Sequence, residues 1–153
     1  MIDHTVEAVW NLSHGLVNPM IKRDEFKDEI NELCLMFSKE DFVVQSSFFN
    51  WRGINKPEIA THLYRIVQEL LQNATKHSGA AQVRIQFLID YGNVITLTYE
   101  DNGKGFDYHS EKMDGIGLIN IENRVTLING KLNFDTKPGG KGTNVIIELE
   151  NHQ

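Results

Sequence analysis

The chain has 153 residues, with 15 lysines and arginines against 21 aspartates and glutamates, so its formal net charge at pH 7 is −6. This acidic balance without a basic cluster gives no sign of a surface for nucleic acid or anionic membrane, and no apolar run is long enough to span a bilayer. Cys34 is the only cysteine, which excludes an internal disulfide and a cysteine-rich metal site and favours the reducing cytoplasm.

Two helices and a strand are expected in the first third of the chain. Apolar residues at intervals of three or four predict a helix that ends near Pro19: they are Val6, Val9, Leu12, Leu16 and Met20. A second stripe of this kind predicts a helix over about residues 24–37, with Phe26, Ile30, Leu33 and Phe37 on one face. The β-branched and aromatic run at 41–49 predicts a strand.

The remaining chain is expected to alternate helices, strands and glycine-rich turns. Pro57 suits the first turn of a helix that ends near Gly79. Alternating apolar residues predict an antiparallel hairpin of strands at 82–89 and 94–100. A glycine-rich loop over 101–117, a helix carrying Leu118 and a last hairpin over 131–149 complete a two-layer α+β sandwich, with helices on one face of a mixed sheet.

The segment "QELLQNATKHS" at residues 68–78 places polar side chains beside the apolar face of its helix. At 100° per residue, one polar stripe borders the core face, and its members are His62, Arg65, Glu69, Asn73 and Lys76. We interpret Asn73 as a direct ligand of Mg²⁺, Glu69 as a group that orients a metal-bound or attacking water, and Lys76 as a charge for phosphate oxygens. His77 lies nearer the apolar stripe and is either a packed histidine or a neighbour of the ligand.

Three glycine clusters follow this helix. "DNGKGF" at 101–106 begins at the end of a strand, where the Asp101 carboxylate could accept a hydrogen bond from the exocyclic amine of adenine, although Asp-Asn-Gly also favours a simple turn. "DGIGL" at 114–118 begins a helix whose N–H groups could hold a phosphate. "GGKGT" at 139–143 suits either a hairpin turn or a nucleotide contact. The P-loop and dinucleotide motifs are both absent.

In this order the motifs resemble the ATP-binding domain of bacterial sensor histidine kinases, whose superfamily includes gyrase and mismatch-repair ATPases. "LYRIVQELLQNATKHS" is similar to the N box, the three clusters are similar to the glycine boxes, and "GLINIENRV" resembles the nitrate-sensor subgroup. The resemblance covers about residues 63–148 and implies an α/β sandwich that binds ATP and Mg²⁺, with a short mobile lid over 106–114. It implies nucleotide contacts from Asn73, His77, Asp101, Gly103, Gly105, Gly115, Ile116, Gly117, Leu118, Gly142 and Thr143.

The first 20 residues resemble the second helix of the dimerisation hairpin of the same kinases, and residues 21–153 would form the catalytic domain. We therefore expect a fragment of a larger protein, which could be anchored in a membrane and would form a homodimer and act on a cognate response regulator. The acceptor histidine of the family lies on the first hairpin helix and is usually followed by an acidic residue. His14 is followed by Gly15, so we interpret His14 as a packing residue.

Two other functions fit parts of the sequence. A free-standing anti-sigma factor that phosphorylates a serine on its antagonist would have the same ATP-binding fold and a similar length, but would be expected to begin with a strand. A nucleotide-responsive scaffold without transfer activity is the third alternative. The leading interpretation is a protein-histidine kinase, in which catalysis is mainly positioning and charge neutralisation.

Overall fold

The computed structural model describes residues 20–152, and for His77 and Asp114 it describes the backbone alone. The helix predicted over the first 20 residues, and with it His14, therefore lies almost entirely outside the described residues. The elements in chain order are α2 (Phe26–Phe37), β1 (Val43–Phe49), α3 (Pro57–Asn73), the π-helical turn η2 (Ala74–Ser78), β2 (Gln82–Ile89), β3 (Val94–Asp101), α4 (Tyr108–Asp114), α5 (Gly117–Leu127), β4 (Lys131–Asp135) and β5 (Thr143–Glu150).

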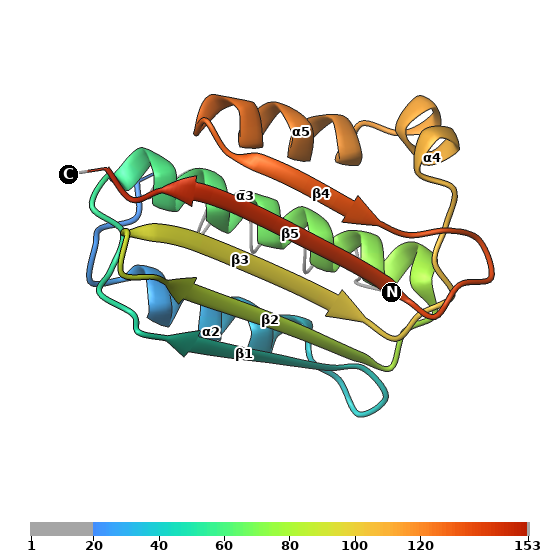
Figure 1. Cartoon of the computed structure of the whole chain (residues 1–153). Coiled ribbons are helices and arrows are strands. Elements are labelled where there is room, and N and C mark those ends of the chain that lie inside the picture. The colour runs from blue at the N-terminus through green and yellow to red at the C-terminus, as the bar shows by residue number, and fades with distance from the viewer. Residues whose placement is uncertain (1–19, 153) are drawn as a thin grey trace.

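One five-stranded sheet, in the order β1-β2-β3-β5-β4, organises the described chain. β1 and β2 are parallel because α3 carries the chain back across the sheet between them, and the other three pairs are antiparallel. Helices α2, α3 and α5 cover one face of the sheet (Figure 1). The predicted hairpins, the mixed sheet and its one-sided helical layer are confirmed.

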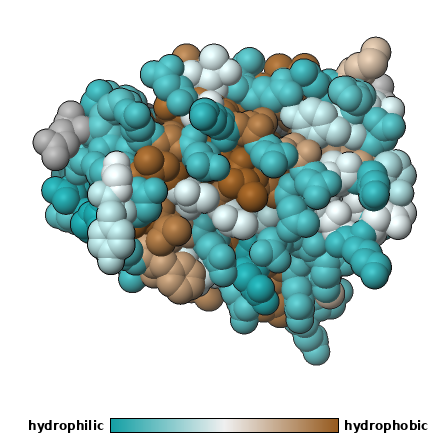
Figure 2. All heavy atoms as spheres, viewed as in Figure 1, coloured by the Kyte–Doolittle hydropathy of each residue, from teal (hydrophilic) through white to brown (hydrophobic). Residues whose placement is uncertain are grey.

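Strand alternation explains which face carries the helices. In β3 the odd-numbered residues Ile95, Leu97 and Tyr99 are buried against the helices, and the residues between them face outward. The outward face is shown in Figure 2, where hydrophilic side chains surround a few hydrophobic ones. Asp101 has the parity of Tyr99, so its side chain belongs to the helical side of the sheet. No helix within residues 20–152 is both long and apolar enough to cross a membrane.

Helix α3 begins at Pro57 and buries an apolar face that includes Leu63, Ile66 and Leu70. Its last turn widens into the π-helical turn η2, which ends at Gly79 with a left-handed φ of 63°. The predicted helix end at Gly79 is therefore right, whereas the widening was not foreseen. Such π-helical turns occur often at functional sites, and this one directly follows Asn73.

The glycine-rich segment 101–117 differs from the sequence-based expectation. It was predicted to be a loop, but it contains α4, whose N-terminus is capped by the Asp107 side chain accepting from the Ser110 N–H at 3.0 Å. Tyr108 packs on Phe134, with ring centroids 4.8 Å apart. The loop prediction was therefore wrong over 108–114, whereas the mobility of the lid stays a prediction.

Candidate functional site

A cavity of about 310 Å³ lies between the C-terminal end of α3 and the start of α5. It gathers seven of the residues that the sequence predicted for the site, namely Glu69, Asn73, Lys76, Gly115, Ile116, Gly117 and Leu118. Gln72, Phe106 and Glu111 complete its lining. The polar stripe of α3 and the second glycine cluster therefore meet at one place, although Ile116 lies 40 positions after Lys76 in the sequence.

Gly117 brings the first turn of α5 against the polar stripe. A Cβ atom at this position would lie 3.2 Å from Glu69 Oε2 and 3.3 Å from Asn73 Oδ1, so a larger side chain would crowd both oxygens. The first N–H groups of a helix have no partner inside it, and the N-cap residue Ile116 supplies no side-chain cap. These donors and the positive end of the helix dipole suit a phosphate in the cavity.

The donors around Gly117 also fit a magnesium ion. Amide and carboxylate oxygens are hard ligands, and Mg²⁺ takes few of them from the protein because it keeps several waters and shares substrate phosphates. Within residues 20–152 no group of three or more His, Cys, Asp or Glu side chains could hold a metal by itself. Asn73 Oδ1, with the Glu69 carboxylate beside it, is thus suited to bind a Mg²⁺ ion whose other ligands are nucleotide phosphates and water.

The turn η2 places Lys76, whose charge was predicted to neutralise phosphate oxygens, at the edge of the same cavity. Lys76 is exposed and lines the cavity. Ser78 closes the turn, because its hydroxyl donates to the Ala74 carbonyl at 2.7 Å and accepts from the Ala80 N–H at 3.0 Å. The backbone of His77 belongs to this turn, and the predicted role of its side chain stays a prediction.

A second group of predicted residues surrounds Asp101 at the end of β3. Its carboxylate accepts from the Tyr99 hydroxyl at 2.6 Å and from the Gly103 N–H at 2.9 Å, which fixes its orientation. Burial first, and then the charge and hydrogen bond of Asp101, raise the pKa of Tyr99 well above its usual value, so the phenol remains a donor. An ionised carboxylate has about four acceptor positions, so Asp101 can still accept from a ligand.

The glycines next to Asp101 allow three backbone segments to meet. A Cβ at Gly142, whose φ is +96°, would clash with the Asp101 carbonyl oxygen, and one at Gly103 would lie 2.5 Å from the Ser78 carbonyl oxygen. Gly105, with φ of +70°, is packed in the same way against the Lys137 carbonyl. The first and third glycine clusters are thus required by close backbone contacts at the Asp101 end of the sheet.

Thr143 and the cavity are connected through a short chain of hydrogen bonds. Thr143 is buried opposite Asp101 in the β3–β5 register, and its hydroxyl lies 2.8 Å from that of Thr136. Thr136 in turn accepts from the N–H of Phe106 at 3.1 Å, and Phe106 lines the cavity. The Asp101 group and the cavity therefore lie at the same end of the sheet, and their joint role in binding a nucleotide stays a prediction. Tyr99 and Thr136 were missed, although the two-residue period marks Tyr99 as a neighbour of Asp101 on the same face.

A further residue that the sequence did not single out, Arg124, joins α5 to the polar stripe of α3. Its Nη1 lies 3.1 Å from Nδ1 of His62. Burial, and then the charge of Arg124, lower the pKa of His62, which favours the neutral imidazole that can accept this hydrogen bond. Burial and then Arg65 lower the pKa of Arg124, and Glu69 opposes both, so Arg124 lies within electrostatic reach of the cavity.

The geometry agrees with the family to which the sequence belongs. Residues 58–153 match the family model described as the histidine kinase-, DNA gyrase B-, and HSP90-like ATPases. This match spans more than half of the chain, and the chain therefore belongs to this family of ATP-binding domains. The expected ATP-binding fold is confirmed.

Individual relatives are sensor histidine kinases. ComP of Bacillus subtilis (strain 168) is 46% identical over 91 residues, which cover 58% of this chain and 12% of ComP. DegS of Brevibacillus brevis, a signal transduction histidine-protein kinase/phosphatase, is 36% identical over 107 residues, which cover 67% of this chain and 27% of DegS. MctS of Rhizobium johnstonii is 27% identical over 145 residues, which cover 91% of this chain and 31% of MctS. The chain thus spans less than a third of the length of each, and the nitrate-sensor subgroup stays a prediction.

Solved structures share the fold. The ATP-binding domain of PrrB from Mycobacterium tuberculosis superposes with a TM-score of 0.66 at 17% identity, covering 89% of this chain and 100% of that domain. The histidine kinase domain of the blue-light activated kinase EL346 from Erythrobacter litoralis superposes with a TM-score of 0.66 at 19% identity, covering 95% of this chain and 70% of that chain. These likenesses confirm the predicted fold class.

Proposed function

We propose that this chain is the catalytic and ATP-binding part of a sensor histidine kinase, which transfers the γ-phosphoryl group of Mg-ATP to an imidazole nitrogen of a phosphoacceptor histidine. One observation carries the proposal. The start of α5 at Gly117 lies against Glu69 Oε2 and Asn73 Oδ1. Backbone N–H groups suited to phosphate and oxygen atoms suited to Mg²⁺ therefore face one cavity. The identity to three sensor histidine kinases favours this function over an anti-sigma factor or a scaffold.

The proposed roles follow from the chemistry of each group. Asn73 binds Mg²⁺, Glu69 orients a metal-bound or attacking water, and Lys76 neutralises charge on the terminal phosphates. Asp101 accepts from the exocyclic amine of adenine, and Thr143 supports that contact. Mg²⁺ supplies charge neutralisation between the phosphates when it is bound, and the residues of the chain supply position.

The parts of the proposal that concern the whole kinase rest on the relatives. We propose that the first 20 residues belong to a dimerisation hairpin and that residues 21–153 form the catalytic domain. In the complete protein, two copies would associate, and the phosphoryl group would pass to a response regulator in the cytoplasm. Gly15 follows His14, so the acidic residue that usually follows the acceptor histidine in these kinases is not found at that position of the sequence, and we propose that His14 is not the acceptor.

Transfer of label from ATP tests the proposal directly. The chain is incubated with γ-labelled ATP and Mg²⁺, alone and mixed with a separate fragment of a related kinase that carries the acceptor histidine. We expect acid-labile label on the added fragment and none on the chain itself. A matched Asn73→Ala chain should lose the transfer. Label on the chain that disappears in His14→Gln would make His14 the acceptor, and binding of ATP without any transfer would favour the scaffold.

A further inference from the structure

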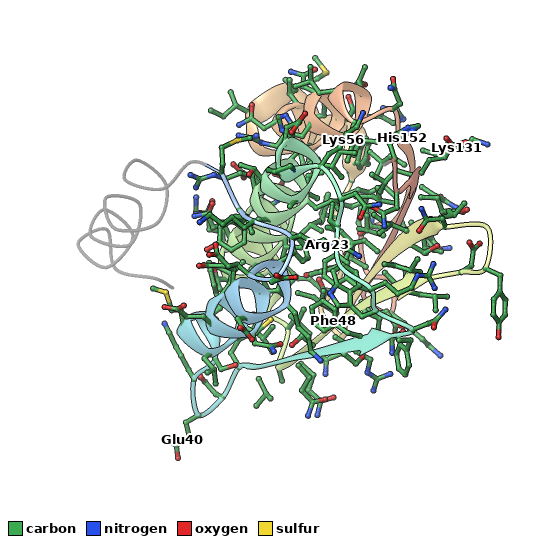
Figure 3. The ribbon with its side chains drawn as sticks, turned by 90° about the vertical axis from the view of Figure 1, so that its left-hand side faces the viewer. Arg23, Glu40, Phe48, Lys56, Lys131 and His152 are labelled. Atoms are coloured by element: carbon green, nitrogen blue, oxygen red, sulfur yellow. The ribbon has the colours of Figure 1, made fainter. Side chains whose placement is uncertain are left out.

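A hollow of about 560 Å³ lies at the end of the sheet opposite to the nucleotide cavity. Its lining residues are Arg23, Arg52, Asn55, Asn93 and Asn151, none of which belongs to the site described above. β3 runs from Val94 beside this hollow to Asp101 beside the cavity, so the length of the sheet separates the two (Figure 1). Figure 3 looks onto this end, with Arg23 near the middle of the view.

Arg23 is held in place by the loop after β1. Its Nε and Nη2 donate to the Arg52 carbonyl at 3.2 and 2.9 Å. Its stem lies over Gly53, where a Cβ atom would be 2.8 Å from Arg23 Cγ. Gly53 is buried and has a φ of +84°, so a side chain at this position would be strained and would displace Arg23. The Arg23 side chain is thus exposed to solvent but oriented by these two hydrogen bonds.

Arg52 is held from another direction, by the turn between β2 and β3. Its Nη2 donates to the Asp90 carbonyl at 3.0 Å and to Asn93 Oδ1 at 3.3 Å. Both arginines thus hydrogen-bond to neutral acceptors, and the Arg23 guanidinium lies against the carbonyl group of Arg52 itself. Two like charges from distant segments are brought to one hollow.

The floor of the hollow is a closed polar network around Asn151, which is only 4% exposed. Its Oδ1 accepts from the Asn55 N–H at 3.1 Å, and its Nδ2 donates to the Gly53 carbonyl at 3.1 Å and to Asn93 Oδ1 at 3.3 Å. One buried amide therefore joins the loop before α3, the β2–β3 turn and the end of β5. A satisfied buried network of this kind rigidifies its surroundings.

The charge of the two arginines is not balanced within the described part of the chain. Neither guanidinium has a carboxylate oxygen within 4.0 Å among residues 20–152, although the whole chain carries a net charge of −6. A guanidinium has five N–H donors, and the bonds above use two from each arginine, which leaves three on each. A fixed, planar donor set of this type matches the oxygens of carboxylate and phosphate groups.

We propose that the Arg23–Arg52 hollow is a binding site for an oxyanion, either a carboxylate or a phosphate group, separate from the nucleotide cavity. The two guanidinium groups provide the charge and the forked donors. The Asn151 network holds the loop and the turn at a constant separation, so little ordering is needed on binding. The site goes beyond the proposed kinase function and does not depend on it.

The arginine Nε–H signals of the ¹⁵N-labelled chain provide the test. The chain is titrated in parallel with inorganic phosphate and with glutarate at constant ionic strength, using sodium chloride as the reference anion. We expect saturable shifts of the Arg23 and Arg52 signals with at least one of the two probes. Saturation with glutarate alone identifies a carboxylate site, and saturation with phosphate alone identifies a phosphate site. Absent or non-saturating shifts of both signals with both probes would overturn the proposal.

A pair of variants separates this site from general surface charge. Arg52→Gln should weaken the binding seen at Arg23 by about tenfold or more, the scale of a lost hydrogen bond to a charged group. Arg84→Gln removes the same charge from an exposed position on β2 and should leave it unchanged. Equal weakening by both variants would contradict a defined site. Urea unfolding shows that each variant is folded, and both should unfold cooperatively like the unmodified chain.

Discussion

Asp101 combines two features that are rarely needed in a surface turn, namely a carboxylate with both oxygens oriented and a strand position on the covered face of the sheet. If it accepts from adenine, Asp101→Asn replaces an acceptor-only group by an amide that must also present a donor. ATP binding should weaken by roughly 1.5–3 kcal/mol, the scale of a hydrogen bond to a charged group. Calorimetry measures this loss.

Two comparisons make the result for Asp101 specific. Tyr99→Phe removes the hydroxyl that orients the carboxylate but leaves the carboxylate in place, so it should cost less than Asp101→Asn. The unmodified chain should bind ATP with much higher affinity than GTP, because guanine presents a carbonyl oxygen where adenine has its amine. Equal affinity for the two nucleotides would rule out the role of Asp101 in base selection.

Asn73 is the residue on which the proposed magnesium site depends. Asn73→Ala should reduce the Mg²⁺-dependent part of ATP binding by at least about tenfold, since even residues that only orient metal ligands cost 10–100-fold when removed. Calorimetry with Mg²⁺ and with a chelator isolates that part. Gln72→Ala, on the same helix and the same cavity lining, is the matched control. A loss of the same size with and without Mg²⁺ would show that Asn73 acts on the nucleotide and not on the metal.

His62 makes stability depend on pH in a predictable direction. Its pKa in the folded chain lies below the ordinary value of 6.5, so the unfolded chain binds more protons as the pH falls below 6.5. The contribution of neutral His62 to the free energy of unfolding is therefore fully present above pH 6.5 and is lost progressively as the pH falls below it. Urea unfolding between pH 7.5 and 5.5 should show this slope, and His62→Gln should reduce it. An unchanged slope in the variant would assign the effect to another group.

At the scale of elements, α4 is tied to α5 through one carboxylate. Glu122 accepts from the Tyr108 hydroxyl at 2.7 Å through Oε2 and pairs with Lys112 Nζ at 2.8 Å through Oε1. The hydrogen bonds from Lys112 and then Tyr108 lower the pKa of Glu122, which keeps it ionised. The predicted lid thus contains the short helix α4, which these two bonds hold against α5, and Met113 of α4 is exposed.

The contact between Glu122 and α4 can be tested by hydrogen exchange. Glu122→Gln should speed amide exchange over 108–114 and leave β2 unchanged, because it removes the charge that holds both α4 partners. Glu148→Gln, the same change on the outer face of β5, should alter neither segment. In the unmodified chain, a non-hydrolysable ATP analogue should slow exchange across 104–116. No change there on adding the analogue would mean that this segment is not a lid.

The sequence predicted long elements with a regular hydrophobic pattern well, and it predicted short elements and individual side-chain contacts poorly. The strands β2, β3 and β5 and the helix α3 followed from alternation and from a 3.6-residue stripe, and the same stripe brought Glu69, Asn73 and Lys76 to one cavity. The helix α4 was missed because a single turn or two of polar residues leaves no periodic signal. The Thr136–Thr143 contact could not be predicted, since it depends on the β4–β5 connection rather than on either residue type.

At the scale of the whole molecule, the domain is larger than the family match. The match begins at residue 58, yet the core on the β1 side is built by residues before it. Phe26 of α2 is fully buried, stacks on Trp51 with ring centroids 5.6 Å apart, and meets the edge of Phe87 on β2 at 5.1 Å. Phe48 of β1 stacks on the same Phe87 at 5.1 Å. Without α2 and β1, an apolar side of β2 would face water.

Phe26→Ala therefore tests whether the segment before residue 58 is part of the folding unit. Truncation of a buried phenylalanine typically costs about 3–5 kcal/mol, through lost transfer energy and an unfilled cavity. Urea unfolding should show a loss of this size in the free energy of unfolding. Leu35→Ala changes the same helix at a side chain that is 77% exposed, and should stay within about 0.5 kcal/mol of the unmodified chain. A loss for Phe26→Ala no larger than that for Leu35→Ala would mean that α2 packs loosely and that residues 58–153 alone hold the sheet together. If the large loss is seen, a chain that begins at residue 58 should fail to give a cooperative unfolding transition. Phe87 would then lack all three rings that contact it in the described part of the chain, those of Phe26, Phe48 and Trp51.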